Sequence, residues 1–277
     1  PSTLLAMGFG CQKALLVGDP LQLPPVTRFG NVEERYNSHE TKEKSLDRDG
    51  INRAMFVRLY NSSSRTAAHM LRTQYRLHPI LSAIPNQLFY DGHLIDGVTA
   101  EDRAPLIPSL PTLLAYNCKN GHAEKLLNSH SYYNLAEANI VVKLLHRLRA
   151  DGISDSSIGV ICLYKAQAEK IEELLACAPV PSENDNITKV VSPNDKKNGK
   201  KQAPRSSKCR KGRVKVSTVD AFQGAERDII VLSTVRSNLP KLDGESFISS
   251  KTRLCVALSR AKRHLIVVGN MSMLWQA

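Results

Sequence analysis

The chain has 277 residues, which is long enough for one large domain or two modest ones around a sizeable core. Its hydrophobic content of 42% and charged content of 23% exclude wholesale disorder, and no apolar stretch approaches the roughly 18–20 residues of a membrane span. The net charge of +12 favours a polyanionic partner, either nucleic acid or an anionic membrane surface.

The N-terminus and the cysteines indicate a longer parent protein in a reducing compartment. The chain starts at Pro1, without an initiator Met or a signal-peptide pattern, so we expect an internal cut. Its six cysteines are far apart and form no C-x-x-C pair, which favours free thiols over a disulfide framework or a zinc site. We therefore expect no metal site in this chain and a cytoplasmic or nuclear location.

The first residues predict the end of one domain. The run KALLVGD, Lys13 to Asp19, has the pattern of a buried strand that feeds a loop. Residues Arg28 to Gly50 are mixed in charge and loop-like. We place a domain boundary shortly after them, which divides the chain into residues 1–66 and 67–277.

A capped helix is the clearest element of the second domain. Within NLAEANIVVKLLHRLRADG, Asn134 can cap the helix start, Glu137 follows three residues later, and Gly152 marks the end. The apolar face of this predicted helix consists of Leu135, Ala138, Val141, Leu145 and Leu148. A strand over IGVICLY and a helix over KAQAEKIEELLACAP, stopped by Pro179, follow it.

A basic segment at residues 180–213 interrupts this pattern. From Glu183 to Arg213 there are ten Lys or Arg residues and three acids, which accounts for seven of the twelve net charges. With almost no core-forming residues, the segment is predicted to be a disordered insertion. It could hold phosphates non-specifically or remain a solvated loop, and the sequence favours neither.

Three strands rich in β-branched residues follow, in VKVSTVD, DIIVLSTV and HLIVVGN. Nearly continuous apolar strands separated by helices predict an α/β fold with a parallel sheet covered on both faces. Ligands in such sheets gather at the carboxyl ends of the strands. The polar residues that we expect at that edge are Asp19, Asp220, Arg236 and Asn270.

Four segments carry candidate chemistry: LLVGDPLQLPPV, QYRLHPILSAIPNQLFYDGHLIDG, STVDAFQGAERDIIVLSTVRSN and RLCVALSRAKRHLIVVGN. In the last, a basic cluster from Arg260 to His264 abuts an apolar run. Basic groups held beside a core usually have an anion as their partner. Any one segment alone could be scaffold, whereas all four in this order are a specific signal.

The four segments resemble motifs III, IV, V and VI of the superfamily 1B helicases, the group that includes the nonsense-mediated-decay helicase and senataxin. The resemblance covers almost the whole chain, except Arg28 to Gly50 and the basic insertion. It implies two RecA-like P-loop NTPase domains that hold ATP between them and grip single-stranded nucleic acid. Residues 1–66 would be the end of the first domain, and 67–277 the second.

The resemblance also implies roles around ATP. Gln22 would sense the γ-phosphate, Arg76 would contact it from the second domain, and Arg260 would be the arginine finger. The other residues expected at the nucleotide are Asp19, Tyr75 at the base, Gly224 in a turn, and Glu226, which would hold the ribose or order the site. A guanidinium suits this task because its forked donors match phosphate oxygens.

Residues expected at the nucleic acid come from two strand ends. Ser217 and Thr218 are small hydroxyl residues that can bond a phosphate without reading sequence. Tyr164 belongs to the same expected surface, although relatives carry Thr-Pro-Tyr where this chain has Cys162-Leu163-Tyr164.

Two further residues have structural alternatives. Arg253 lies seven residues before Arg260, so we expect both on one helical face, with Arg253 either near ligand or in an internal salt bridge. His78 in LHP is expected to be a structural residue at a helix start.

The chain lacks a Walker A loop and the acidic pair that holds magnesium. We therefore expect Mg²⁺ to be held by carboxylates outside this chain, and the missing RecA-like domain to be supplied in cis or in trans. Residues 1–277 alone should hydrolyse little ATP. The expected partner is single-stranded RNA, favoured over DNA, with no membrane partner.

A different class of function remains open, in which the chain is a non-catalytic nucleic-acid-binding or scaffolding remnant. Retained γ-phosphate residues count against it, because a binder needs no arginine finger. The coding sequence upstream of Pro1 separates the two hypotheses: a Walker A loop supports the enzyme, and a start codon near Pro1 supports the remnant.

Overall fold

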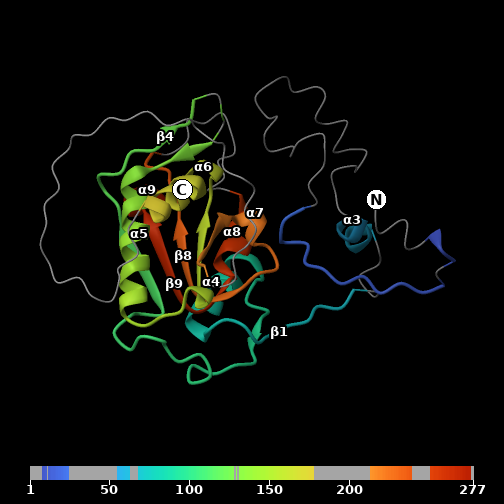
Figure 1. The fold of residues 1–277 in the computed structure, drawn as a ribbon. Coiled ribbons are helices and arrows are strands. Elements are labelled where there is room, and N and C mark those ends of the chain that lie inside the picture. The colour runs from blue at the N-terminus through green and yellow to red at the C-terminus, as the bar shows by residue number, and fades with distance from the viewer. Residues whose placement is uncertain are drawn as a thin grey trace, which may run out of the picture.

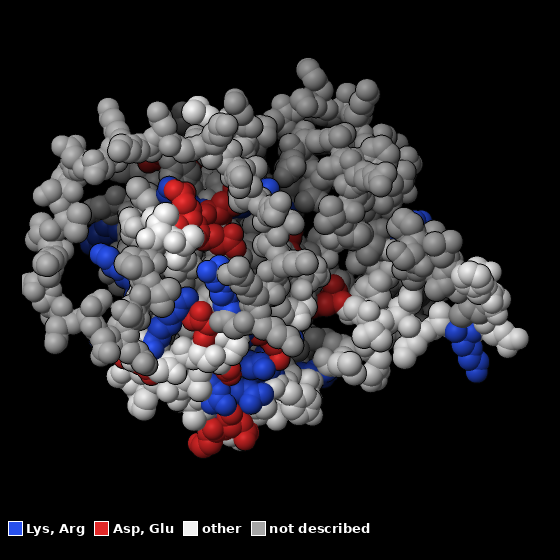
Figure 2. Space-filling view, in the orientation of Figure 1, with Lys and Arg blue, Asp and Glu red and all other residues white. Residues whose placement is uncertain are grey.

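The computed structural model describes residues 8–10, 12–24, 55–62, 68–127, 129, 131–177, 213–238 and 250–275. Arg28 to Gly50 and residues 180–212 of the basic segment lie outside this range, so the predictions for them stay predictions. On the face shown in Figure 2, acidic and basic side chains of the described residues are interspersed. None of the described helices is both long enough and apolar enough to cross a membrane.

A five-stranded parallel sheet forms the centre of the second domain (Figure 1). Its order is β3 (Leu113–Asn117), β9 (Ala261–Gly269), β8 (Arg227–Ser233), β6 (Ile158–Cys162) and β7 (Lys215–Thr218), and all four pairings are parallel. The predicted α/β class and the parallel sheet are confirmed. Every strand predicted in this domain is present, and β9 begins three residues before its predicted start.

Helices cover both faces of the sheet, as the apolar strands predict (Figure 1). On one face pack α5 (Leu135–Ala150) and α6 (Lys165–Cys177), against Val160, Ile229 and Val231. On the other face pack α4 (Pro79–Phe89), α7 (Val219–Phe222), α8 (Lys251–Leu258) and α9 (Met271–Leu274). Two buried aliphatic cores therefore hold the strands in place.

Short elements complete the described part. Strand β1 (Thr73–Gln74) pairs in parallel with β2 (Ile95–Asp96), and β4 (Glu124–Lys125) pairs antiparallel with β5 (Tyr132–Tyr133). A 3₁₀ turn, η3 (Asp155–Ser157), precedes β6, and helix α3 (Met55–Ser62) lies in the N-terminal segment.

The predicted helix after Asn134 is confirmed as α5. The Asn134 side chain accepts a hydrogen bond from the Glu137 backbone N–H, and Gly152 follows the helix with a φ of +80°. Four of the five predicted core positions are buried, while Leu135 is 43% exposed because it opens the first turn.

Two local predictions are wrong. Lys13 to Asp19 forms no strand, and Leu15 is 90% and Val17 81% exposed. A strand needs a neighbour for its hydrogen bonds, and in the described residues none lies beside this run. The predicted division at residues 66 and 67 stays a prediction.

The second error concerns Arg260, which is not on a helix with Arg253. Helix α8 ends at Leu258 with Ser259 as its C-cap, and β9 starts at Ala261. Ala261 pairs with Arg227, whose backbone N–H donates to the Arg260 carbonyl. The pairing of β9 with β8 thus begins before the β-branched run of β9, and α8 ends earlier than predicted.

Leu145 tests the α5 side of the core. Leu145→Ala should lower the free energy of unfolding by about 2–5 kcal/mol, because the side chain is fully buried. Leu135→Ala, the same change in the first turn of the same helix, should cost no more than about 0.5 kcal/mol. Urea denaturation of both variants measures the difference, and equal midpoints would contradict the packing described.

Candidate functional site

The loop that carries Arg76 is held by Gln74 at the end of β1. The Gln74 side-chain oxygen accepts the backbone N–H groups of Arg76 and Leu77, both at 2.9 Å. Its amide nitrogen donates to Asp96 at 2.6 Å and to the Leu77 carbonyl at 2.9 Å. The backbone at Arg76 is thereby fixed before its side chain makes any contact.

Arg76 reaches from this loop to the segments before β8 and β9. Its Nε donates to Glu226 at 2.5 Å, and its Nη1 donates to the Ser259 carbonyl at 3.0 Å. Lys262 donates to the other Glu226 oxygen at 2.9 Å. The hydrogen bonds from Lys262 and Arg76 hold the pKa of Glu226 below its ordinary value. Glu226 therefore anchors Arg76 as a carboxylate.

Arg260 is only 2% exposed, yet none of its hydrogen bonds within the described residues goes to a carboxylate. Its Nε donates to the Val256 carbonyl at 2.9 Å, and its Nη2 donates to the Ser259 hydroxyl at 2.8 Å. Burial, followed by repulsion from Arg76, lowers the pKa of Arg260 to about 10. The group still carries its charge at neutral pH, with that charge only partly compensated.

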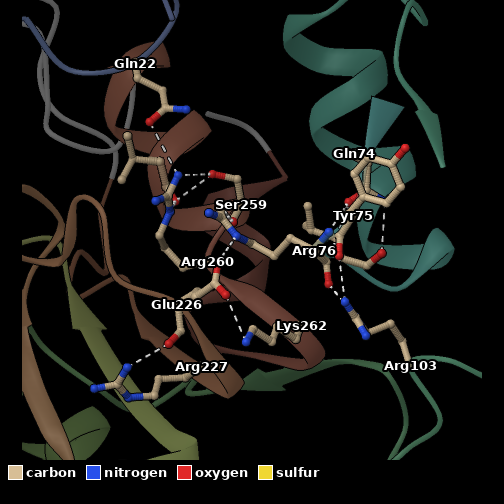
Figure 3. A network of polar contacts seen from close by, with 12 residues as sticks. Gln22, Gln74, Tyr75, Arg76, Arg103, Glu226, Arg227, Ser259, Arg260 and Lys262 are labelled. Atoms are coloured by element: carbon tan, nitrogen blue, oxygen red, sulfur yellow. Dashed lines mark hydrogen bonds and ion pairs between the residues drawn. The ribbon is translucent and has the colours of Figure 1, made fainter. Parts of the chain in front are cut away.

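Gln22 meets Arg260 from the N-terminal segment. Its side-chain oxygen accepts Arg260 Nη2 at 3.4 Å, and its amide nitrogen donates to Asp19 at 2.9 Å. Figure 3 shows Gln22 reaching toward Arg260, with Arg76 and Ser259 beside it. The three residues predicted around the γ-phosphate thus lie together.

Tyr90, the C-cap of α4, ties Asp19 to the second domain. Its hydroxyl donates to Asp19 Oδ2 at 2.6 Å and lies 3.4 Å from the sulfur of Cys255. Burial, the Asp19 hydrogen bond and the nearby thiol raise the pKa of Tyr90 far above its ordinary value. The neutral phenol therefore acts as a donor that holds the loop of Gln22.

A cleft of about 630 Å³ lies between the N-terminal segment and the second domain. Its chemical character comes from Asp19, Gln22, Arg76, Gly224 and Arg260, all of which line it. A buried guanidinium beside a second guanidinium attracts an anion, and the volume suits a small-molecule ligand.

The other basic residues of the C-terminal cluster already have partners. Lys262 pairs with Glu226, and Arg263 pairs with Asp228 at 3.3 Å. His264 is buried, accepts the Leu106 backbone N–H and meets the Pro111 carbonyl. Burial lowers its pKa, so the ring is a neutral structural bridge. Of the cluster, Arg260 is the member left for an outside anion.

Arg253 and His78 take the structural alternatives. Arg253 is buried and pairs with Asp220 at 3.5 Å, which confirms the internal salt bridge. The His78 ring caps α4 by accepting the Ile80 backbone N–H, and the His78 backbone N–H donates to the Lys262 carbonyl. Burial lowers the pKa of His78, which suits a neutral acceptor.

Tyr75 lies outside the lining of the cleft. Its side chain is 66% exposed and its ring rests against Gly97, where a Cβ would come within 2.4 Å of the ring. Arg103 donates to the Tyr75 carbonyl at 2.6 Å and to that of Arg76 at 2.8 Å. Most of the ring is exposed, which leaves room for a base to stack on it.

The residues predicted at the nucleic acid are unequally placed. Thr218 ends β7 and is half-buried, and its side chain makes no capping hydrogen bond to α7. The Ser217 hydroxyl is buried without a hydrogen-bond partner among the described residues, so this placement gives Ser217 no support as a phosphate ligand. Tyr164 is buried, with its ring against Tyr132.

Sequence reasoning missed Tyr132 and a second role of Glu137. The Tyr132 ring lies under the Arg236 guanidinium, 4.5 Å from its centroid. Glu137 is fully buried and accepts hydrogen bonds from the Ser233 hydroxyl at 2.8 Å and the Val235 N–H at 2.9 Å. The Tyr pair before Asn134 was a visible signal for Tyr132, whereas no local pattern marks Glu137 as more than part of a cap.

The parallel sheet with helices on both faces is that of a RecA-like domain. Residues 51–272 match the family described as AAA domain. The chain belongs to this family, in its superfamily 1B helicase branch. Within the described residues, no group of His, Cys, Asp or Glu could hold a metal ion.

Named relatives agree with this placement. The chain is 38% identical over 275 residues to the 5'-3' DNA helicase ZGRF1 of Mus musculus, covering 99% of this chain and 12% of that protein. It is 33% identical over 281 residues to the regulator of nonsense transcripts 1 homolog of Neurospora crassa, covering 99% and 22%. It is 31% identical over 275 residues to the ATP-dependent helicase NAM7 of Saccharomyces cerevisiae, covering 98% and 24%. The chain thus spans less than a quarter of each relative's length.

Glu137 makes stability depend on pH. Burial raises its pKa to about 7, whereas an unfolded Glu titrates near about 4.3. The folded chain binds this proton more tightly, so the contribution is complete below about pH 4 and is lost as the pH rises toward about 7. Glu137→Gln cannot titrate, so its stability relative to the wild type should rise by about 1–3 kcal/mol between about pH 5 and about pH 8. Urea midpoints measure this, and a difference independent of pH would contradict it.

Proposed function

We propose that the whole protein is an ATP-dependent helicase or translocase on single-stranded nucleic acid. This chain supplies its second RecA-like domain and the end of the first. The observation that carries the proposal is the convergence of Arg76 and Arg260 on one cleft beside Gln22. A non-catalytic scaffold has no use for a buried guanidinium that lacks a carboxylate.

The cleft fits the triphosphate of ATP. Arg260 lacks a carboxylate partner among the described residues, and its lowered pKa reports a charge that an anion would stabilise. Arg76 is held by Glu226 with its guanidinium at the same cleft. When bound, ATP with its divalent cation supplies the phosphoryl group that is transferred to water.

Each residue of the chain then has a distinct task. Arg260 neutralises charge on the equatorial oxygens as the bond to the leaving group lengthens, and Arg76 adds a second guanidinium. Gln22 reports the phosphate to the first domain through Asp19. The ligands of Mg²⁺ and the Walker A loop are assigned to the parent protein outside this chain.

The nucleic acid is assigned to the carboxyl edge of the sheet, near Thr218, with RNA favoured over DNA. Regulators of nonsense transcripts recur among the relatives, while another relative is named a DNA helicase. Both substrates therefore belong in the test. We place the protein in the cytoplasm or nucleus, where both are available.

The central experiment measures ATP turnover by the whole parent protein with and without single-stranded RNA and DNA. Arg260→Ala should lower the stimulated rate by roughly 10³–10⁵-fold, the scale of an arginine finger. Arg149→Ala, a matched change at an arginine that pairs with Asp155, should leave the rate unchanged. Residues 1–277 alone should turn over little ATP, and robust turnover that Arg260→Ala abolishes would refute the division proposed.

Tyr90 should matter for turnover although it lies behind the cleft wall. Tyr90→Phe removes the hydrogen bond that holds Asp19, so the Gln22 loop loses its tie and kcat should fall by roughly tenfold. Tyr133→Phe is the matched control, because that hydroxyl also donates to a carboxylate, Glu124, away from the cleft. In a Gln22→Ala background the Tyr90 change should have no additional effect. A full additional loss there would show that Tyr90 acts by another route.

A further inference from the structure

The chain after β8 is held in a costly conformation. Val235 is β-branched, fully buried, and has a φ of +70°. A positive φ at such a residue is strained and persists only where the surrounding contacts hold it. Here Glu137 accepts the Val235 N–H at 2.9 Å, and Asn134 donates to the Val235 carbonyl at 3.2 Å.

The groups that hold Val235 are themselves buried and expensive. Glu137 is a fully buried acid, and the Ser233 hydroxyl donates to it at 2.8 Å. Gln167 on α6 donates to the Ser233 hydroxyl at 3.0 Å and accepts the Asn134 N–H at 2.8 Å. Residues of α5, α6 and β8 thus share a single polar network. This network fixes the turn after Val235.

That turn presents Arg236. The Arg236 guanidinium lies 4.5 Å from the centroid of Tyr132, and Tyr132 packs edge-on against Tyr164 with centroids 5.5 Å apart. The next residue is also held, because the Ser237 hydroxyl accepts the Ala123 N–H at 3.0 Å. No described carboxylate lies within ion-pair distance of Arg236. A guanidinium stacked on a ring keeps its in-plane donors available for an outside anion.

The position of Arg236 in the sheet indicates which kind of anion it can bind. Arg236 follows the carboxyl end of β8, and Thr218 ends β7 at the same edge, since both strands run parallel to β6. The proposed nucleotide cleft is lined instead by residues before the amino ends of β8 and β9, namely Gly224 and Arg260. An anion at Arg236 is therefore not the triphosphate in that cleft.

We propose that Arg236 binds a backbone phosphate of the single strand, and that Glu137 is the positioning residue that aims it by clamping Val235. This rests on the proposed function, which supplies the nucleic acid. Glu137 touches no ligand; its effect passes through the backbone of Val235. Tyr132 supports the guanidinium from below.

The binding half is tested with the whole protein and a fluorescent single-stranded oligonucleotide, by anisotropy without ATP over a range of salt. Arg236→Ala should weaken binding roughly tenfold, the scale of one charge-assisted hydrogen bond. The slope of log affinity against log salt should fall by about one. Arg147→Ala, an exposed arginine at the far end of α5, removes the same charge and should change neither quantity by as much.

The positioning half is tested by two conservative variants of Glu137. At about pH 8, above its pKa of about 7, Glu137 is mostly ionised, so Glu137→Asp keeps the charge but withdraws the oxygen from the Val235 N–H. This variant should weaken binding toward the level of Arg236→Ala. Glu137→Gln keeps the reach and loses the charge, and it should bind within about twofold of the wild type. In the Arg236→Ala background, neither variant should have a further effect.

The outcomes separate the two proposals. A wild-type protein that binds no single strand overturns the proposed function. A wild type that binds, with Arg236→Ala binding equally well, overturns only the present inference. If Glu137→Gln loses affinity while Glu137→Asp keeps it, charge and not position is at work, and the clamp is refuted. Urea midpoints of each variant confirm that the compared proteins are folded.

Discussion

The site depends on one buried charge whose partner is not a carboxylate of the described chain. Arg260 is held by a backbone carbonyl, a hydroxyl and a side-chain amide, and a second guanidinium lies beside it. Taking a guanidinium out of water is costly unless an anion compensates it. Glu226, an acid whose charge acts on Arg260, is already paired with Arg76 and Lys262. A scaffold would gain no stability from such a buried charge. Together these contacts leave a position at which a ligand's negative charge can bind.

The two ends of the sheet carry different sites, and β8 connects them. Glu226 comes directly before β8, and the Val235–Arg236 turn comes just after it. The strand lies between β6 and β9, and its central residues are buried. The sequence rule that ligands gather at carboxyl ends therefore predicts the edge of Arg236 and Thr218, whereas the cleft beside Arg260 lies at the opposite edge. The reason is that α7 and the Gln223–Gly224 turn bring the chain back before β8 starts, so the guanidinium-binding groups lie at the opposite edge.

How far sequence reasoning reached depends on whether the decisive contact was local. The cap of α5, the histidine at the start of α4 and the parallel sheet follow from spacing within a few residues, and all three are confirmed. The helix around Arg260 was wrong because pairing of Ala261 with Arg227 ends it, and that contact joins residues far apart in sequence. The strand at Lys13 to Asp19 was wrong because a strand needs a neighbour to pair with, and no described residue pairs with this run. Glu137 looked like part of a cap, and its clamp on Val235 spans almost a hundred residues. The motifs identified Gln22, Arg76 and Arg260 in the sequence, but only the fold shows that these three residues lie at one cleft.

The features that lower the stability of this domain are concentrated at the two candidate sites, and ordinary apolar packing makes up the rest. A buried guanidinium, a buried carboxylate and a left-handed valine each lower stability, while the two aliphatic cores between them are made of ordinary Ile, Val and Leu packing. Local rules that a stable chain should obey are broken where function requires a particular geometry. In the proposed function the domain closes on a triphosphate and a single strand, and charges that are fixed beforehand avoid a reorganisation that would be added to the barrier. The strained backbone at Val235 and the partly compensated charge of Arg260 therefore have the same consequence at the two ends of one sheet. Each fixes a guanidinium in advance, at the expense of stability that the cores can supply.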